Sequence, residues 1–141
     1  MKLEDIDLGK PTNPKIRIIS EWEIMKNYYK PYAIQNKDWH WLYNFKAAKL
    51  EAKFLWKKLP TDRQWSKLAK TKNDIPNIVY AGYCYGGSCK GLGYDVYYWS
   101  SSVVLASPTY NWARRSHYAL PSVNRFADDK ENAFSVRCLK D

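Results

Sequence analysis

The chain has 141 residues, of which 45% are hydrophobic and 16% aromatic, and its formal net charge is +9. This length suits one domain with its own core, and the composition excludes wholesale disorder. No apolar run approaches the roughly 18–20 residues that span a bilayer. The start, Met1 to Asp5, lacks the apolar stretch of a signal peptide, so we expect none in this chain.

The positive charge is concentrated in the first part of the chain. Residues 1–90 carry 17 Lys and Arg against 9 Asp and Glu, whereas residues 91–141 carry 6 against 5. A lysine-rich surface attracts phosphate or an acidic partner, but it also serves simply to keep a domain soluble. The sequence leaves both interpretations open.

The chain has three cysteines, Cys84, Cys89 and Cys138. An odd number argues against a full disulfide framework. Cys84 and Cys89 either close a small loop or stay free thiols in a turn. The two histidines, His40 and His117, are distant from each other and show no paired ligand spacing. We therefore expect no metal site and no cofactor.

The first elements in chain order are an arm and a strand. Residues 1–14 are polar and contain Gly9, Pro11 and Pro14, which predicts a loosely ordered N-terminal arm. Residues 15–20 are β-branched and partly alternating, which indicates a strand at the start of a single domain over 15–141.

Two helices are predicted next. Residues 38–57 fit a helix capped by Asp38, because Phe45, Ala48 and Ala52 recur at helical spacing and share one face. After the break at Pro60, Thr61 and Gln64 form a capping box, in which each side chain satisfies a backbone N–H of the first turn. We expect this second helix to fade near residues 71–73.

From Ile75 onward, glycine, tyrosine, serine and valine dominate, which predicts short strands joined by turns. We place the strands at about 78–85, 95–101, 110–118 and 133–139. Two helices followed by several strands indicate the α+β class.

Catalytic motifs are missing. Gly87-Ser88-Cys89 is followed by Lys90, where a nucleophile elbow needs a second glycine. No glycine-rich stretch ends in Gly-Lys-Ser or Gly-Lys-Thr, so there is no P-loop. We expect a protein that is not an enzyme and has no catalytic residue.

Three motifs, in this order, carry a resemblance to a known family. They are Leu59-Pro60-Thr61-Asp62-Arg63-Gln64-Trp65, then Tyr98-Trp99-Ser100-Ser101-Ser102, and finally Phe134-Ser135-Val136-Arg137-Cys138-Leu139-Lys140-Asp141. Over about residues 40–141 the chain resembles the C-type-lectin-like branch of the Fibrobacter succinogenes major paralogous domain and the formylglycine-generating enzymes. It looks especially like the variable proteins of diversity-generating retroelements, a system carried by viruses and microbes, including archaea.

This resemblance implies a C-type lectin-like fold, with two helices packed on small, twisted, mainly antiparallel sheets and a broad ligand-binding face near the C-terminus. The calcium-dependent sugar site of related lectins uses a Glu-Pro-Asn or Gln-Pro-Asp triplet. Here the later prolines stand in Ser107-Pro108-Thr109 and Leu120-Pro121-Ser122. Calcium and sugar binding are therefore not expected.

A retroelement of this kind rewrites adenines, so Asn codons become codons that never encode Lys, Glu, Gln, Met or Trp. Residues 91–129 contain no Lys, Glu, Gln or Met, although the other 102 residues contain 26 of them. Only Trp99 and Trp112 break the pattern, and we interpret both as framework. Segments rich in β-structure favour Val, Tyr, Ser and Thr in any case, which is the alternative explanation.

We therefore predict a hypervariable segment at about 101–128 on a fixed framework. The framework residues are expected to be buried: Trp65, Trp99, Trp112, Phe134 and Val136. Contact residues are expected on the variable surface: Val103, Val104, Ser107, Thr109, Tyr110, Arg114, Ser116, His117, Tyr118, Leu120, Ser122 and Phe126. On one strand, Tyr110, Arg114 and Tyr118 would share a face with Trp112, while Arg115 and His117 would lie on the other, and only one face can be exposed.

The expected function is selective, non-covalent binding of an unknown protein or surface ligand, displayed on a virion or cell surface. A nucleic-acid-binding module is the first alternative, because Lys46, Lys49, Lys53, Lys57, Lys58, Lys67, Lys70 and Lys72 lie near Trp41, Trp56 and Trp65 in the sequence. A structural subunit of a virion or surface assembly is the second. The sequence does not fix the oligomeric state.

Overall fold

A computed structural model describes all 141 residues. It is a small α+β domain with two α-helices and four small sheets, which confirms the predicted class. All strand pairs are antiparallel except the parallel pair β2–β3. The elements are β1 (Lys2–Leu3), β2 (Arg17–Ile19), η1 (Glu21–Glu23), η2 (Met25–Asn27), β3 (Tyr32–Gln35), β4 (Trp41–Tyr43), α1 (Phe45–Phe54), α2 (Asp62–Leu68), η3 (Lys72–Asp74), β5 (Tyr83–Tyr85), β6 (Ser88–Lys90), β7 (Asp95–Val103), β8 (Tyr110–His117), β9 (Val123–Asp129) and β10 (Leu139–Lys140).

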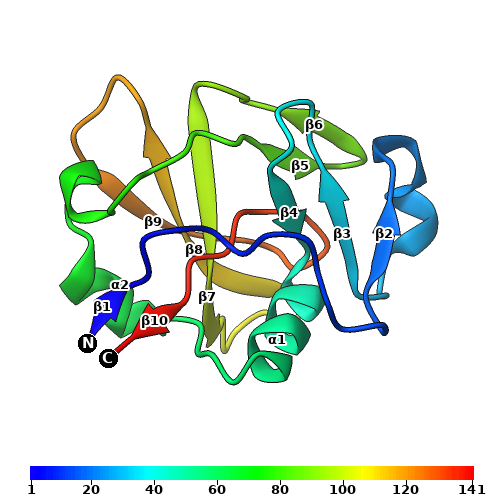
Figure 1. Cartoon of the computed structure of the whole chain (residues 1–141), viewed down its shortest axis with the longest axis horizontal. Helices are drawn as coiled ribbons and strands as arrows, with labels where there is room; N and C mark the ends of the chain where they lie inside the picture. The colour runs from blue at the N-terminus through cyan, green and yellow to red at the C-terminus, as the bar shows by residue number, and fades with distance from the viewer.

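The two ends of the chain lie side by side (Figure 1). Strand β1 pairs antiparallel with β10, and Lys2 lies opposite Lys140. The prediction of a loosely ordered arm over residues 1–14 is wrong, because Leu3 and Leu8 are buried. The Leu8 N–H also donates to the Val136 carbonyl at 2.9 Å. The N-terminal segment is therefore part of the domain.

A buried arginine explains why this polar segment is held in place. The Arg137 side chain has no exposed surface, and its Nε donates to Asp7 Oδ1 at 2.7 Å. It also donates to the carbonyls of Glu4 and Pro76. Burial raises the pKa of the Asp7 carboxyl and outweighs the opposing attraction of the Arg137 charge. One carboxylate of the N-terminal segment, Asp7, thus pairs with a buried cation of the C-terminal segment.

The first helix begins later than predicted. Its N-cap is Asn44, whose side chain accepts from the Ala47 N–H, and not Asp38. Residues 41–43 form strand β4 against β3 instead, and Asn36 organises a tight turn by accepting from the backbone of Asp38 and His40. The predicted apolar face of the helix is confirmed, since Phe45, Ala48 and Ala52 are buried.

The second helix begins where predicted. The Thr61 side chain accepts from the Gln64 N–H, and the Gln64 side chain accepts from the Thr61 N–H, which is a complete capping box. Helix α2 ends at Leu68, a few residues before the expected fade. The cap is a local signal, and the local residues were enough to find it.

The sheet β7–β8–β9 is the largest in the molecule and positions the segment predicted to vary. Strands β7 and β8 match the predicted strands at 95–101 and 110–118, whereas β3, β4 and β9 were not predicted. Residues 133–138 run as a connecting segment with isolated bridges and not as a continuous strand. Through Tyr43↔Phe134 and Tyr98↔Ser135 it joins the β2–β3–β4 sheet to the β7–β8–β9 sheet.

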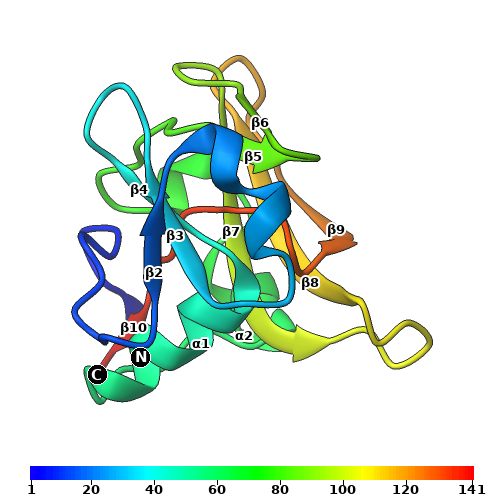
Figure 2. The same ribbon diagram turned by 90° about the vertical axis from the view of Figure 1, so that its right-hand side faces the viewer.

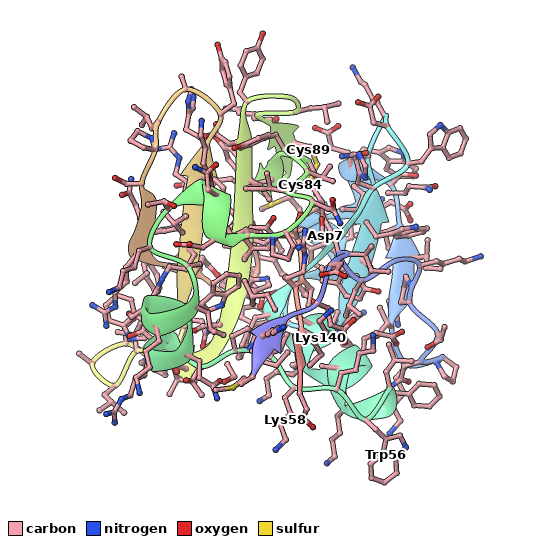
Figure 3. The ribbon with its side chains drawn as sticks, turned by 60° about the vertical axis from the view of Figure 1, so that its left-hand side comes forward. Asp7, Trp56, Lys58, Cys84, Cys89 and Lys140 are labelled. Atoms are coloured by element: carbon pink, nitrogen blue, oxygen red, sulfur yellow. A yellow bond between two sulfur atoms is a disulfide. The ribbon has the colours of Figure 1, made fainter.

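The sequence left open whether Cys84 and Cys89 form a disulfide or stay free thiols, and the structure has the disulfide. Cys84 and Cys89 are opposite each other in the β5–β6 hairpin and form a disulfide (Figure 3). Cys138 is a free, buried thiol, and burial raises its pKa to about 12. A thiol in that state is a small apolar core residue and not a nucleophile at neutral pH.

Candidate recognition surface

Most of the segment predicted to vary lies at the surface. Between residues 103 and 127 only Asn111, Ala113, Arg114 and Ser116 are buried. Leu105, at the tip of the β7–β8 loop, is 96% exposed. A large aliphatic side chain held fully in water contributes nothing to the core, so its position there is free to vary.

The predicted contact residues lie at two separate ends of β8. One group belongs to the β7–β8 loop and the strand ends beside it: Val103, Val104, Ser107, Thr109 and Tyr110. The other lies at the end of β8 and in the β8–β9 connection: His117, Tyr118, Leu120 and Ser122. The eight residues of β8 separate the two groups by roughly 25 Å. They therefore form two patches and not one.

Arg114 is wrongly placed among the contact residues, because it is only 2% exposed. Its guanidinium donates to Asp62 Oδ1 at 2.7 Å, to the Asp62 carbonyl at 2.8 Å and to Ser66 Oγ at 2.9 Å. Arg114 thus fastens α2 to the middle of β8. It is a structural residue that the sequence interpretation took for a binding anchor.

Ser116 and Phe126 also need correction. Ser116 is fully buried, and its hydroxyl has no hydrogen-bond partner. Phe126 is half-buried, with its ring 5.0 Å from that of Tyr97 and 6.3 Å from that of Phe134. Phe126 lies on the face of the sheet that carries Trp99 and Ala113, because those three residues are in register across the strands. It belongs to the edge of the core.

Four of the five predicted framework residues, Trp65, Trp99, Phe134 and Val136, have no exposed surface. The Trp99 indole donates to the Tyr43 carbonyl at 2.8 Å, and its ring stacks on Phe134 with centroids 4.2 Å apart. The Trp65 indole donates to the Trp99 carbonyl at 3.3 Å. Each indole therefore buries a large apolar area while its N–H stays satisfied, which favours a rigid centre.

Trp112 differs from the other framework residues, because it is only half-buried. The Arg125 guanidinium lies 3.4 Å from the centroid of its ring, in stacking contact. Arg125 is itself half-exposed and pairs with Asp62 at 2.9 Å. Trp112 is therefore not a core residue but one wall of a surface feature.

That feature is a hollow of about 510 Å³ between the start of α2 and the β7–β8 loop. We call it the loop hollow, and it is lined by Thr61, Asp62, Arg63, Ser102, Val103, Val104, Leu105, Ala106 and Trp112. Two hydrogen bonds fix its base: the Asp62 N–H donates to Ser102 Oγ at 2.9 Å, and the Ser101 N–H donates to the Pro60 carbonyl at 2.9 Å. The hollow combines an indole wall, aliphatic side chains and both signs of charge.

The two charged groups of the loop hollow differ in their partners. Burial disfavours the Asp62 carboxylate, but hydrogen bonds from Arg125 and Arg114 outweigh this effect, so the pKa of Asp62 is lowered. Arg63 is exposed and belongs to no ion pair. The hollow therefore presents one compensated carboxylate and one free cation to a ligand.

A larger cavity, of about 720 Å³, lies away from the variable segment, between the β2–β3–β4 sheet and the β5–β6 hairpin. Its floor contains Ile19, Ile34 and Leu42, all buried. Its charged groups, Glu21, Lys37 and Lys90, are all exposed at the surface. The sequence interpretation missed this cavity, because strands β3 and β4, which supply its floor, were not predicted.

No group of three or more His, Cys, Asp or Glu side chains is arranged to hold a metal ion. None of the helices is both long enough and apolar enough to cross a membrane. No protein-family model, curated protein or solved structure matches this chain.

Proposed function

We propose that this chain is a non-catalytic ligand-binding protein with a C-type lectin-like fold, whose C-terminal surface is diversified by a retroelement. The ligand is a protein or another surface component, and the loop hollow is the centre of the contact. Binding is non-covalent, and the protein is displayed on a virion or cell surface.

One observation carries this proposal. The stretch without Lys, Glu, Gln or Met ends at residue 129, and from 103 to 127 it leaves only four side chains buried. Trp99, one of the two tryptophans inside the stretch, is fully buried. A stretch shaped only by burial would place its apolar residues inward, yet Val103, Leu105 and Leu120 all point outward.

The shape of the domain supports the same proposal. Two helices pack on small sheets, as expected for the family that the three motifs resemble. The motif around Thr61 starts α2, and the motif around Trp99 supplies the stacked core. The exposed β7–β8 loop thus stands on a buried core whose contacts do not involve the loop.

The loop hollow suits a ligand with a protruding apolar or aromatic group. Trp112 and the stacked Arg125 offer a flat platform, while Val103 and Leu105 offer aliphatic contact. Indole and guanidinium groups are the side chains that most often dominate protein interfaces. The free Arg63 charge favours a carboxylate on the ligand beside that group.

The test is a pair of libraries displayed on the same scaffold. One randomises Val103, Leu105, Ala106 and Thr109, and the other randomises the buried residues Trp99, Ala113, Phe134 and Val136. We expect most members of the first library, and few of the second, to resist proteolysis as folded protein. Equal loss of folded members in both libraries would contradict the proposal.

The neighbouring DNA tests the retroelement itself. We expect a near-identical repeat beside a reverse transcriptase gene, differing from the coding sequence of about residues 101–128 mainly at adenines. A flanking sequence with neither feature would remove the retroelement from the proposal, while the libraries would still test whether the exposed loop tolerates substitution.

Nucleic-acid binding remains the second candidate, favoured by one observation. Trp56 is 96% exposed just after α1, where its indole projects from the molecule (Figure 3), and Lys57 and Lys58 follow it in the sequence. Trp65, by contrast, is fully buried and is not available for stacking. Binding of single-stranded DNA that weakens steeply with added salt, and is lost in Trp56→Ala, would support this candidate.

A further inference from the structure

Strand β9 is the outer strand of the largest sheet. It pairs with β8 on one side, and Figure 2 shows it at one flank of the molecule with no strand beyond it. It spans seven residues, Val123–Asp129. A strand of this length with an open edge offers unpaired backbone groups to another chain, and proteins usually shorten or cover such edges.

The hydrogen bonds at the two ends of β9 show which backbone groups point outward. The Val123 N–H donates to the Lys70 carbonyl, which lies on the side away from β8. Because backbone groups alternate along a strand, those of Arg125 and Ala127 point to the same outer side. At the far end the Asp129 N–H is taken by Asp128 Oδ1. The outward backbone groups of Arg125 and Ala127 thus remain without partners, whereas the N–H groups at both ends of β9 are already hydrogen-bonded.

The edge also carries opposite charges at its two ends. Lys70 adjoins the start of β9, and Arg125 follows within the strand. Asp128 and Asp129 stand at its end, followed by Lys130 and Glu131, and the Lys130 ammonium donates to the Pro108 carbonyl. A parallel copy would set like charges against each other, whereas an antiparallel copy sets the basic end against the acidic end.

We propose that the edge of β9 pairs antiparallel with β9 of a second copy of this chain, about a two-fold axis at Phe126, giving one continuous six-stranded sheet. In this register Arg125 lies opposite Ala127 of the second copy, and their outward groups form about four backbone hydrogen bonds. Phe126 faces its own equivalent, and Asn124 faces Asp128 of the second copy. Such self-complementarity is the property of a closed two-fold interface.

The two ends of β9, where the outward N–H groups already have partners, limit the length of the contact. The backbone at Lys70 occupies the position next to Val123, so pairing between the copies ends with Asn124 opposite Asp128, and the chain of the second copy turns away at Asp129. Asp129 of the second copy then arrives beside the Lys70 side chain. The register is therefore fixed by the chain at both ends, and this interface does not depend on the loop hollow or on the proposed function.

The first experiment measures the mass of the full chain in solution over a wide range of concentration. Salt is held at about 0.15 M, where the mutual repulsion of two chains of charge +9 is screened beyond about 8 Å. Wild type is expected to pass from one chain to two. In Ala127→Pro the outward N–H is lost without any loss of a β8–β9 bond, so we expect a rise of at least about tenfold in the dissociation constant and unchanged circular dichroism.

Ala127→Val is the matched control, because it keeps the N–H and adds a residue that favours strands; it should associate like wild type. A wild type that stays a single chain at every concentration would overturn the proposal, as would a folded Ala127→Pro that still forms pairs.

A charge swap tests the register even if the proline variant fails to fold. Lys70→Glu and Asp129→Lys should each weaken self-association by about tenfold or more, because each places like charges together twice. Mixing the two variants should restore association, since both contacts then join opposite charges. Self-association of either variant at the strength of wild type, or no association in the mixture, would refute the antiparallel register.

Discussion

Trp99 and Leu105 lie six residues apart, yet they belong to regions with opposite physical demands. Trp99 has no exposed surface and makes contacts with Tyr43, Phe45 and Phe134. Leu105 is 96% exposed at the tip of the loop that follows the same strand. The comparison shows that one strand and the loop after it hold a fully buried side chain and a nearly fully exposed one, so we expect the loop to tolerate substitution with little loss of stability.

The largest effect is expected when a buried core side chain is truncated. Trp99→Ala removes a stacked indole and leaves a cavity that the surrounding side chains cannot fill. We expect a loss of about 3–5 kcal/mol in the free energy of unfolding, measured by urea denaturation. A midpoint equal to that of wild type would show that the framework lies elsewhere.

Arg114 sharpens the comparison, because it lies inside the stretch predicted to vary but is buried like Trp99. Arg114→Ala leaves Asp62 and Ser66 without their shared partner, and we expect a loss of about 2 kcal/mol. Arg125→Ala is the matched control: that side chain is half-exposed, so its loss should cost less. Equal, small effects of both changes on thermal unfolding would contradict the structural role of Arg114.

The pH dependence of stability separates the contribution of Asp62 from the rest. The pKa of Asp62 is lowered in the folded state, so its ionisation stabilises the protein above the ordinary value of 3.8, and this contribution is lost as the pH falls below it. Asp62→Asn should lose less than Arg114→Ala, because the backbone carbonyl and Ser66 still accept from Arg114.

The stability difference between wild type and Asp62→Asn should be largest near pH 7 and should shrink below pH 3.8. Taking the difference matters, because burial raises the pKa of Asp7 and Asp128, which act in the opposite direction. A difference that stays constant down to strongly acid pH would rule out the ion pairs as its cause.

The smallest effect is expected at the exposed residues of the β7–β8 loop and the strand ends beside it. Val103, Leu105 and Tyr110 are all at least 41% exposed, so replacing all three by Ser should change the free energy of unfolding by less than about 1 kcal/mol. Thermal denaturation of this triple variant, measured alongside Trp99→Ala, gives the direct comparison. A loss approaching that of Trp99→Ala would mean that the loop is part of the core.

The parts of the fold that the sequence predicted are those with local signals. Thr61 and Gln64 lie three residues apart and specify the start of α2 by themselves. The start of α1 was placed too early, because the strand pairing of residues 41–43 with β3 competes with the helix. Strand β9 reads Val-Asn-Arg-Phe-Ala-Asp-Asp, which has no clean alternation, and only its pairing with β8 makes it a strand.

The candidate site was predictable to the same degree. Exposure of the segment as a whole followed from its composition, but the fate of single residues did not. Arg114 is buried because of Asp62, which lies 52 positions earlier, and no local pattern reports such a partner. Trp112 looked like Trp99 in the sequence, but the register of the strands places it on the opposite face of the sheet, where the Arg125 side chain from the neighbouring strand stacks on it.

The pairing of β1 with β10 has a practical consequence for attachment. Both ends leave the domain at one place, so a tether joined to either end would hold the molecule in nearly the same orientation (Figure 1). Experiments that immobilise the protein by one end should therefore give the same accessibility of the loop hollow as those that use the other.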